Sequence, residues 1–159
     1  ILIALGGGAL VGTLGVSQLR KESTRAISFV ASGIGSGLSI VLLGVASGPN
    51  AVLPAAVLAG ISQASYMALS ATLVQSVVAD RFRARVMSLY IMIAAGHMAI
   101  LNLGFGQFAE AVEVRALLAV PGLIWVALFV TLVLVLPEAR SVAIRGRFTH
   151  DDQVTGVPV

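Results

Sequence analysis

The chain has 159 residues, of which 58% are hydrophobic and 11% are charged. A soluble domain of this size carries about 25% charged residues, so too few charges are present here to hydrate an exposed surface. Uncharged runs over 1–19, 26–79, 86–109 and 116–137 exclude a soluble enzyme, a coiled coil and a disordered tail. The absence of cysteine excludes disulfide frameworks and thiol catalysis.

The uncharged runs predict membrane-spanning helices, because a helix needs about 20 largely apolar residues to cross a bilayer. The run 26–79 is too long for one crossing, and Gly48-Pro49-Asn50 favours a turn within it. The predicted spans are about 1–19, 26–47, 52–79, 86–109 and 116–136. We therefore predict an all-α integral membrane protein with five transmembrane helices, followed by a polar tail over 137–159.

The basic residues predict how these helices are oriented. Nine of the ten lysines and arginines fall on one side of the membrane, in the loops 20–25 and 80–85 and in the tail, and only Arg115 falls on the other. Basic loops usually face the cytoplasm. We therefore expect a multi-pass protein of the plasma membrane, which is the inner membrane in bacteria, with a cytoplasmic C-terminus. Basic residues grouped at the ends of spans argue against a nucleic-acid partner.

The third predicted helix has a polar side. At about 100° per residue, one half of its circumference collects Ser62, Gln63, Ser65, Tyr66, Ser70, Thr72 and Ser76. Serine-rich sides also occur where helices pack closely, so a simple helix contact is an alternative. The large polar groups of Gln63 and Tyr66 need a partner or water. We expect Gln63, Tyr66 and Ser70 to line a cavity.

The fourth predicted helix carries Tyr90 and His97, which are seven residues apart and lie near one stripe, and Asn102 lies elsewhere on it. A histidine near the middle of a span can bind a polar ligand, relay a proton, or donate a neutral hydrogen bond between helices. We add Tyr90, His97 and Asn102 to the candidate cavity, while the purely structural role of His97 stays open.

Other features of the spans concern packing. Glycines at GxxxG spacing favour close approach of the first two helices: Gly8/Gly12, Gly33/Gly37 and Gly44/Gly48. The fifth predicted helix is apolar apart from Thr131 and Trp125, so we expect it at the edge of the bundle, against lipid. Two isolated histidines and the lack of paired acids within a span match no catalytic or metal-binding motif. We expect no enzyme, cofactor or metal.

A specific pattern spans the stretch 73–90. It contains Gln75, Asp80, Arg83 and the run Arg85-Val86-Met87-Ser88. This stretch resembles the junction between helices 10 and 11 in the major facilitator superfamily, closest to its enterobactin-exporter and macrolide-efflux-like branch, the transmembrane secretion effectors. Ala84 departs from the pattern, because the family usually has glycine there.

The resemblance implies that the five helices correspond to helices 8 to 12 of a twelve-helix fold and that this is a C-terminal part of a longer chain. The start at Ile1, inside an apolar run, agrees with that expectation. It also implies alternating access around a site near the midplane. Helices 8, 10 and 11 would line the cavity, and helices 9 and 12 would lie outside.

The implied function is secondary active export of a small amphipathic compound such as a drug or a siderophore. The implied partners are that small-molecule substrate, the lipid bilayer, the missing N-terminal helices of the same chain and a coupling proton, carried by an acid in the missing part or by His97. A set of residues at the junction is expected to act at the cytoplasmic rim as a gate: Gln75, Asp80, Arg83 and Arg85. The alternative is a multi-pass membrane subunit or scaffold that does not transport.

Overall fold

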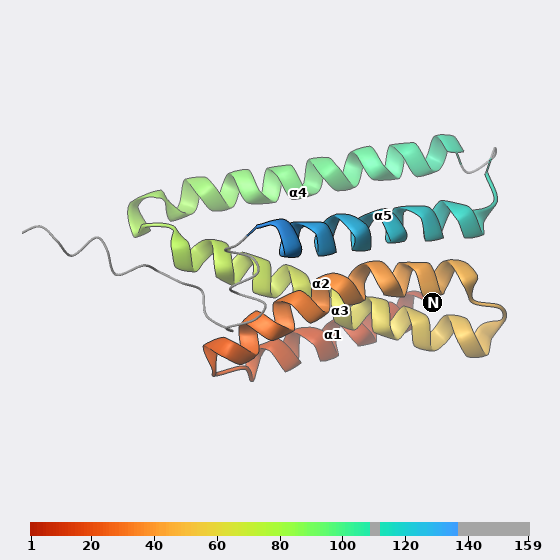
Figure 1. Cartoon of the computed structure of the whole chain (residues 1–159), viewed down its shortest axis with the longest axis horizontal. Coiled ribbons are helices and arrows are strands. Elements are labelled where there is room, and N and C mark those ends of the chain that lie inside the picture. The colour runs from red at the N-terminus through yellow and green to blue at the C-terminus, as the bar shows by residue number, and fades with distance from the viewer. Residues whose placement is uncertain (109–111, 137–159) are drawn as a thin grey trace, which may run out of the picture.

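The computed structural model describes residues 1–108 and 112–136, without the side chains of Glu22 and Val77. These residues form helices and no strand. The helices are α1 (Leu2–Ser17), α2 (Glu22–Val45), α3 (Pro49–Val77), α4 (Asp80–Phe108) and α5 (Val114–Val135) (Figure 1). The prediction of an all-helical membrane protein is confirmed. The polar tail predicted over 137–159 lies outside the described residues.

Four of the helices have the length and apolar composition needed to cross a membrane. The candidate spans are Ser23–Val45, Pro49–Ser76, Asp80–Phe108 and Val114–Val135. The apolar helix α1 has 16 residues, or about 24 Å at 1.5 Å per residue, against a hydrocarbon core of about 30 Å. As described, α1 is therefore shorter than a full crossing.

Helices α2 to α5 all begin two to six residues earlier than the apolar runs indicated, and two of them show why. The prediction started α3 near Val52, but α3 begins at Pro49, after Gly48 with φ 81°. Proline suits the first turn of a helix because its missing N–H would have no partner there. Helix α4 begins at Asp80, so the charged residues before Val86 are helical too. Hydropathy marks where a helix can enter lipid, whereas the helix itself extends into the polar layer.

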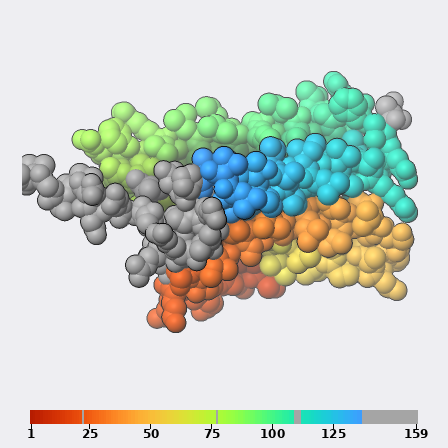
Figure 2. Space-filling model, viewed as in Figure 1, coloured from red at the N-terminus to blue at the C-terminus, as the bar shows by residue number. Residues whose placement is uncertain are grey.

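The helices pack in the lateral order α1, α3, α2, α5. Helix α3 lies between α1 and α2, and α2 also packs along α5. Helix α4 touches α3 only slightly and contributes no buried residue. In Figure 1 it runs alongside this row of four helices, and Figure 2 shows α4 and α5 forming one side of the surface. We refer to α1, α3, α2 and α5 as the packed row.

Glycines set the close contact between α1 and α3. A methyl group on Gly8 would collide with the backbone of Val57, and one on Gly12 would lie 2.5 Å from the carbonyl oxygen of Ile61. From the other side, a methyl group on Gly60 would collide with the carbonyl oxygen of Leu5. The backbones of α1 and α3 are therefore in direct contact, as the GxxxG spacing of Gly8 and Gly12 predicted.

The contact between α2 and α5 also depends on glycines of α2. A methyl group on Gly33 would collide with the ring of Phe129, and one on Gly37 would lie 2.7 Å from Trp125. Gly44 faces the backbone of α5 in the same way. Gly48 has open space around it and belongs to the turn before α3, so the pair Gly44/Gly48 does not act as a packing motif.

The buried polar side chains of α2 need no partner on another helix. Ser32, Ser36 and Ser39 are buried. Their hydroxyls donate to carbonyl oxygens one turn earlier in α2, on Phe29 at 3.0 Å, Ser32 at 2.8 Å and Ser36 at 2.9 Å. Local bonds of this kind satisfy the hydroxyl inside a membrane helix. These serines thus pack as small residues and carry no site.

Candidate functional site

The polar residues of α3 contact different neighbouring helices. The Ser65 hydroxyl donates to the carbonyl oxygen of Gly12 in α1 at 3.3 Å. Ser62 is buried against α2, where its hydroxyl would lie 2.8 Å from a methyl group on Gly35. Part of the polar side predicted for this helix is therefore helix contact, which was the alternative that the sequence left open.

Gln63 and Ser70 lie on a different side of α3. They are about 20° apart around the helix, and Gln63 is about 160° from Ser65, which faces α1. Both side chains are half-buried. The Ser70 hydroxyl donates to the carbonyl oxygen of Tyr66 at 2.6 Å. Gln63 and Ser70 therefore lie two turns apart on the same side of α3, on the opposite side of the helix from Ser65.

Tyr66 lies in an aromatic cluster that joins three helices, together with Phe29 of α2 and Trp125 and Phe129 of α5. Its ring stacks on Phe29 with a centroid distance of 5.3 Å. It also makes T-shaped contacts with the rings of Trp125 and Phe129, at centroid distances of 5.6 Å and 5.9 Å. Such pairs stabilise a contact beyond the area that they bury. The Tyr66 ring is thus a packing element of the row.

Sequence reasoning did not include the other members of this cluster among the functional residues. Trp125 and Phe129 are four residues apart in α5, and Gly33 and Gly37 have the same spacing in α2. Aromatic residues on one helix facing glycines at matching spacing on another are a usable signal for a helix contact. The apolar composition of α5 by itself predicts contact with lipid and does not reveal this helix contact. Helix α5 does lie at the end of the packed row, but one of its faces packs against α2.

The polar residues of α4 divide between two faces. Tyr90 is half-buried, and His97 lies about 20° from it around the helix. Val86 and Ala94, which are also half-buried, lie on the same side. Asn102 is exposed and lies more than 100° from Tyr90, so it does not belong to that face. The structure thus groups Tyr90 with His97 and separates Asn102 from them.

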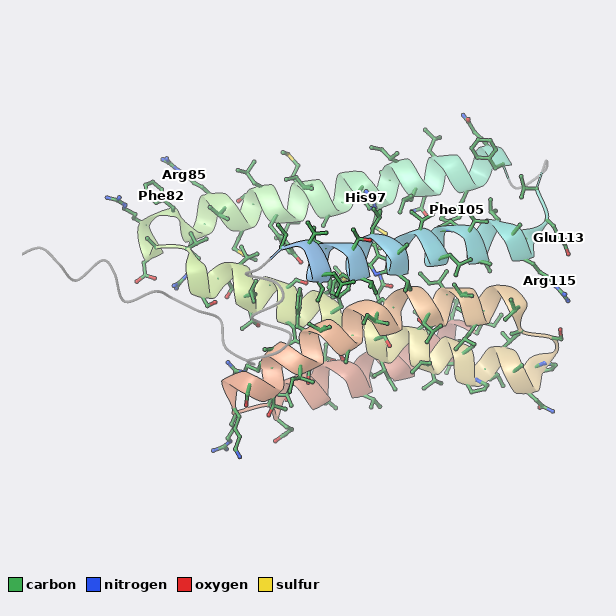
Figure 3. All side chains as sticks on the ribbon, viewed as in Figure 1. Phe82, Arg85, His97, Phe105, Glu113 and Arg115 are labelled. Atoms are coloured by element: carbon green, nitrogen blue, oxygen red, sulfur yellow. The ribbon has the colours of Figure 1, made fainter. Side chains whose placement is uncertain are left out.

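His97 lies near the middle of α4 (Figure 3). Its side chain is exposed, and none of the hydrogen bonds among the described side chains involves it. A group of three or more His, Asp or Glu residues that could hold a metal ion is absent from the described part of the chain. His97 is therefore an exposed imidazole near the middle of a candidate membrane span.

The basic loops lie at one end of the helices. The turn between α1 and α2 and the turn between α3 and α4 share this end, and the segment between α4 and α5, with Glu113 and Arg115, lies at the other (Figures 1 and 3). At the basic end, Gln75 is exposed near the end of α3. The Arg25 guanidinium Nε donates to the carbonyl oxygen of Leu19 at 2.8 Å.

The first turns of α4 carry the remaining candidates. The Asp80 carboxylate forms an ion pair with the Arg83 guanidinium at 2.6 Å. The side chain of Asp80 is 89% exposed and that of Arg83 is 47% exposed. The Arg81 guanidinium lies 4.6 Å from the centre of the Phe82 ring. Arg85 points away from the other helices (Figure 3). The gate residues predicted from the sequence therefore do not form one cluster, because Asp80 and Arg83 pair while Arg85 projects elsewhere.

A family model described as transmembrane secretion effector matches residues 1–156. No curated protein and no solved structure matches the chain. The matched range includes all five helices and the junction over 73–90. The chain belongs to the transmembrane secretion effector family of major facilitator transporters.

Proposed function

We propose that this chain exports a small amphipathic compound by alternating access, with its substrate path between α3 and α4. The observation that carries the proposal is that α4 has no buried residue, although one of its faces holds Tyr90 and His97. Polar groups in a membrane are costly against lipid and usually face a cavity or another polar group. Gln63 and Ser70 supply polar groups on a side of α3 that is not used against α1.

The weak packing of α4 supports a moving wall. Alternating access needs a part of the transporter that can rock against the rest around a fixed site. The packed row is joined by backbone contact at glycines, whereas α4 makes few contacts with it. We place the helices at positions 8 to 12 of the twelve-helix fold, so that the other half of the fold supplies the opposite wall.

The basic end supports a rim at the cytoplasmic side of a plasma membrane. The Asp80–Arg83 pair lies in the first turn of α4, and Gln75 lies near the end of α3, just before the turn that joins the two helices. A pair that is this exposed contributes little to folding, so it is available to exchange partners when the rim opens and closes. His97 is the group that we propose for proton coupling within these helices.

The test is export from cells that carry the full-length gene. Cells are loaded with a panel of amphipathic dyes, drugs and siderophores, and their accumulation is compared with that of a deletion strain. For a compound that is exported, Gln63→Leu with Ser70→Ala should raise accumulation toward the level of the deletion strain. Thr72→Val is the matched control, because the Thr72 hydroxyl is exposed and donates to its own helix at Ala68.

A second candidate is a membrane scaffold that does not transport. It is favoured by the engagement of Ser62, Ser65 and Tyr66 in helix contacts rather than in an open wall. If deletion of the gene changes the accumulation of no compound in the panel, and the protein co-purifies with a membrane partner, the scaffold explains the data and export does not.

A further inference from the structure

The middle of α2 is rich in glycine and serine. Residues 32–37 read Ser-Gly-Ile-Gly-Ser-Gly and lie at the centre of the candidate span Ser23–Val45. Glycine weakens the interior of a helix relative to alanine, and pairs of glycine and serine are common points at which helices bend. Helix α2 nevertheless continues through them without a break. We refer to residues 32–37 as the glycine–serine segment.

Four carbonyl oxygens in and next to the glycine–serine segment have a second hydrogen-bond donor. In an α-helix, each carbonyl oxygen accepts from the N–H four residues later. The three buried serine hydroxyls of α2 donate in addition to the carbonyl oxygens of Phe29, Ser32 and Ser36. The indole Nε1 of Trp125 in α5 donates to the carbonyl oxygen of Gly33 at 2.9 Å.

A second donor matters because the hydrocarbon core of a membrane contains no water. When a helix bends there, an opened backbone bond leaves a carbonyl oxygen without a partner, which is costly. Serine hydroxyls and side chains of neighbouring helices lower that cost by bonding the freed oxygen. In α2 these donors are already in place. The backbone bonds that can open without an unpaired carbonyl oxygen are donated by the amides of Gly33, Ser36, Gly37 and Ile40.

Helix α5 is weakened where it faces the glycine–serine segment. Pro121 lies inside α5 and lacks the N–H that would bond the preceding turn. The next residue, Gly122, touches Gly37. A methyl group on Gly37 would lie 2.9 Å from the carbonyl oxygen of Gly122, and one on Gly122 would lie 2.8 Å from the carbonyl oxygen of Gly37. Helix α5 can therefore follow a bend in α2 while the two helices stay in contact.

We infer that the glycine–serine segment is a hinge at mid-depth in the membrane, and that Trp125 holds it through the carbonyl oxygen of Gly33. In the continuous helix, Trp125 shares this oxygen with the N–H of Gly37. In the bent helix, Trp125 keeps the oxygen bonded after that N–H has moved away. The alternative is a rigid contact in which the glycines serve only close packing. The contacts that carry the inference lie within α2 and α5, so it does not depend on export.

The experiment is hydrogen–deuterium exchange of the full-length protein in lipid nanodiscs, resolved to single amides by mass spectrometry. Ser62 of α3 provides the reference at the same depth, because a methyl group on Gly35 would lie 2.8 Å from its hydroxyl. After correction for intrinsic exchange rates, the amides of Gly33, Ser36 and Gly37 should exchange about tenfold faster than that of Ser62, since glycine lowers the stability of a helix interior.

Removing the second donors should slow this exchange. With Ser32→Ala and Ser36→Ala combined, the carbonyl oxygens of Phe29 and Ser32 lose their partner when the helix opens. The amides of Gly33 and Ser36 should then exchange about tenfold more slowly, or about threefold for each hydroxyl. Ser28→Ala is the matched control, because it is the same substitution at a half-buried position of the same helix, and its hydroxyl makes no hydrogen bond within the described part of the chain.

Trp125→Phe tests the donor from α5. It should slow exchange of the Gly37 amide about threefold, because the bent helix loses the partner of the Gly33 carbonyl oxygen. The slower local exchange should occur although the whole protein resists unfolding less well without this bond. Faster exchange of the Gly37 amide would make Trp125 a packing contact and would remove it from the hinge.

Three outcomes would overturn the hinge itself. Equal exchange of the glycine–serine segment and Ser62 would show a rigid contact. Faster exchange in the double serine variant would show that the hydroxyls support only the continuous helix. An equal slowing in Ser28→Ala would assign the effect to the helix propensity of alanine. A circular dichroism spectrum with wild-type helix content shows that each variant is folded, and the measurement needs no transported substrate.

Discussion

The indole Nε1 of Trp125 donates a hydrogen bond to the carbonyl oxygen of Gly33, 2.9 Å away, and so joins α5 to α2. Gly33 also leaves room for the ring of Phe129, which stacks with Trp125 at a centroid distance of 6.3 Å. One glycine of α2 therefore accepts both a hydrogen bond and an aromatic ring from α5. This contact fixes the end of the packed row.

Trp125→Phe should destabilise the α2–α5 contact by about 1 kcal/mol, since hydrogen bonds between membrane helices contribute on that order. The phenylalanine keeps an aromatic ring in the cluster but removes the donor. Unfolding in mixed detergent micelles with increasing sodium dodecyl sulfate measures the change. Thr131→Val, at an exposed position of the same helix, is the control, and an equal effect of the two substitutions would contradict the prediction.

Gly8→Ala should destabilise the protein by about 1–3 kcal/mol, because the added methyl group meets the backbone of Val57, which has little freedom to move. Gly7→Ala is the matched control, since nothing lies within 4 Å of the position of its methyl group. Alanine favours the helix equally in both variants. The changes in unfolding free energy relative to the wild type should therefore have opposite signs in the two variants. A similar stability of both would show that the α1–α3 contact is looser than described.

Tyr66→Phe should keep the fold, because the stacking on Phe29 and the edge contacts with α5 involve the ring. Tyr66→Ala should cost about 3–5 kcal/mol through the cavity that it leaves. If the hydroxyl belongs to the proposed substrate path, export by Tyr66→Phe falls although unfolding is unchanged. Wild-type export by Tyr66→Phe would restrict Tyr66 to packing.

His97→Gln should flatten the dependence of export on pH. An imidazole can take up and release a proton, whereas the glutamine amide can form hydrogen bonds but cannot titrate. Initial rates of dye export from inverted vesicles at a series of pH values provide the measurement. A profile that keeps its shape in both His97→Gln and His97→Ala would reduce His97 to a structural residue.

Reversing the rim pair should test its role without affecting the fold. Asp80→Arg and Arg83→Asp should each slow export, and the double variant should recover part of it, because the pair is restored with opposite polarity. An exposed pair contributes about 0–1 kcal/mol to stability, so unfolding should change little. If the double variant exports no faster than the slower single variant, the ion pair between positions 80 and 83 does not determine the rate of export.

Much of the fold follows from the amino-acid sequence for simple physical reasons. The uncharged runs locate the helices because a bilayer demands about 20 apolar residues and satisfied backbone bonds. The spacing of Gly8 and Gly12 predicts a close contact because only a hydrogen side chain allows two backbones to touch. Charges do not mark helix ends as well, since α4 starts at Asp80, six residues before the apolar run.

The candidate site was less predictable. The angular position of a polar residue says on which side of its own helix it lies, but not which neighbour occupies that side. Ser65 and Gln63 come from the same predicted polar face of α3, yet Ser65 bonds α1 and Gln63 does not. The neighbour is set by glycines on α1 and α2, which are distant in the chain. Likewise, Trp125 gained its role from the glycines of α2 that face it.

The isolation of α4 has a consequence for how such a protein can diversify. In the packed row, many substitutions are forbidden because a single methyl group would force two backbones apart. Along α4, no residue is buried within these five helices, so new residues there disturb fewer contacts with the packed row. If the substrate path runs along α4, the range of exported compounds can change by mutation of this one helix while the four other helices keep their sequence.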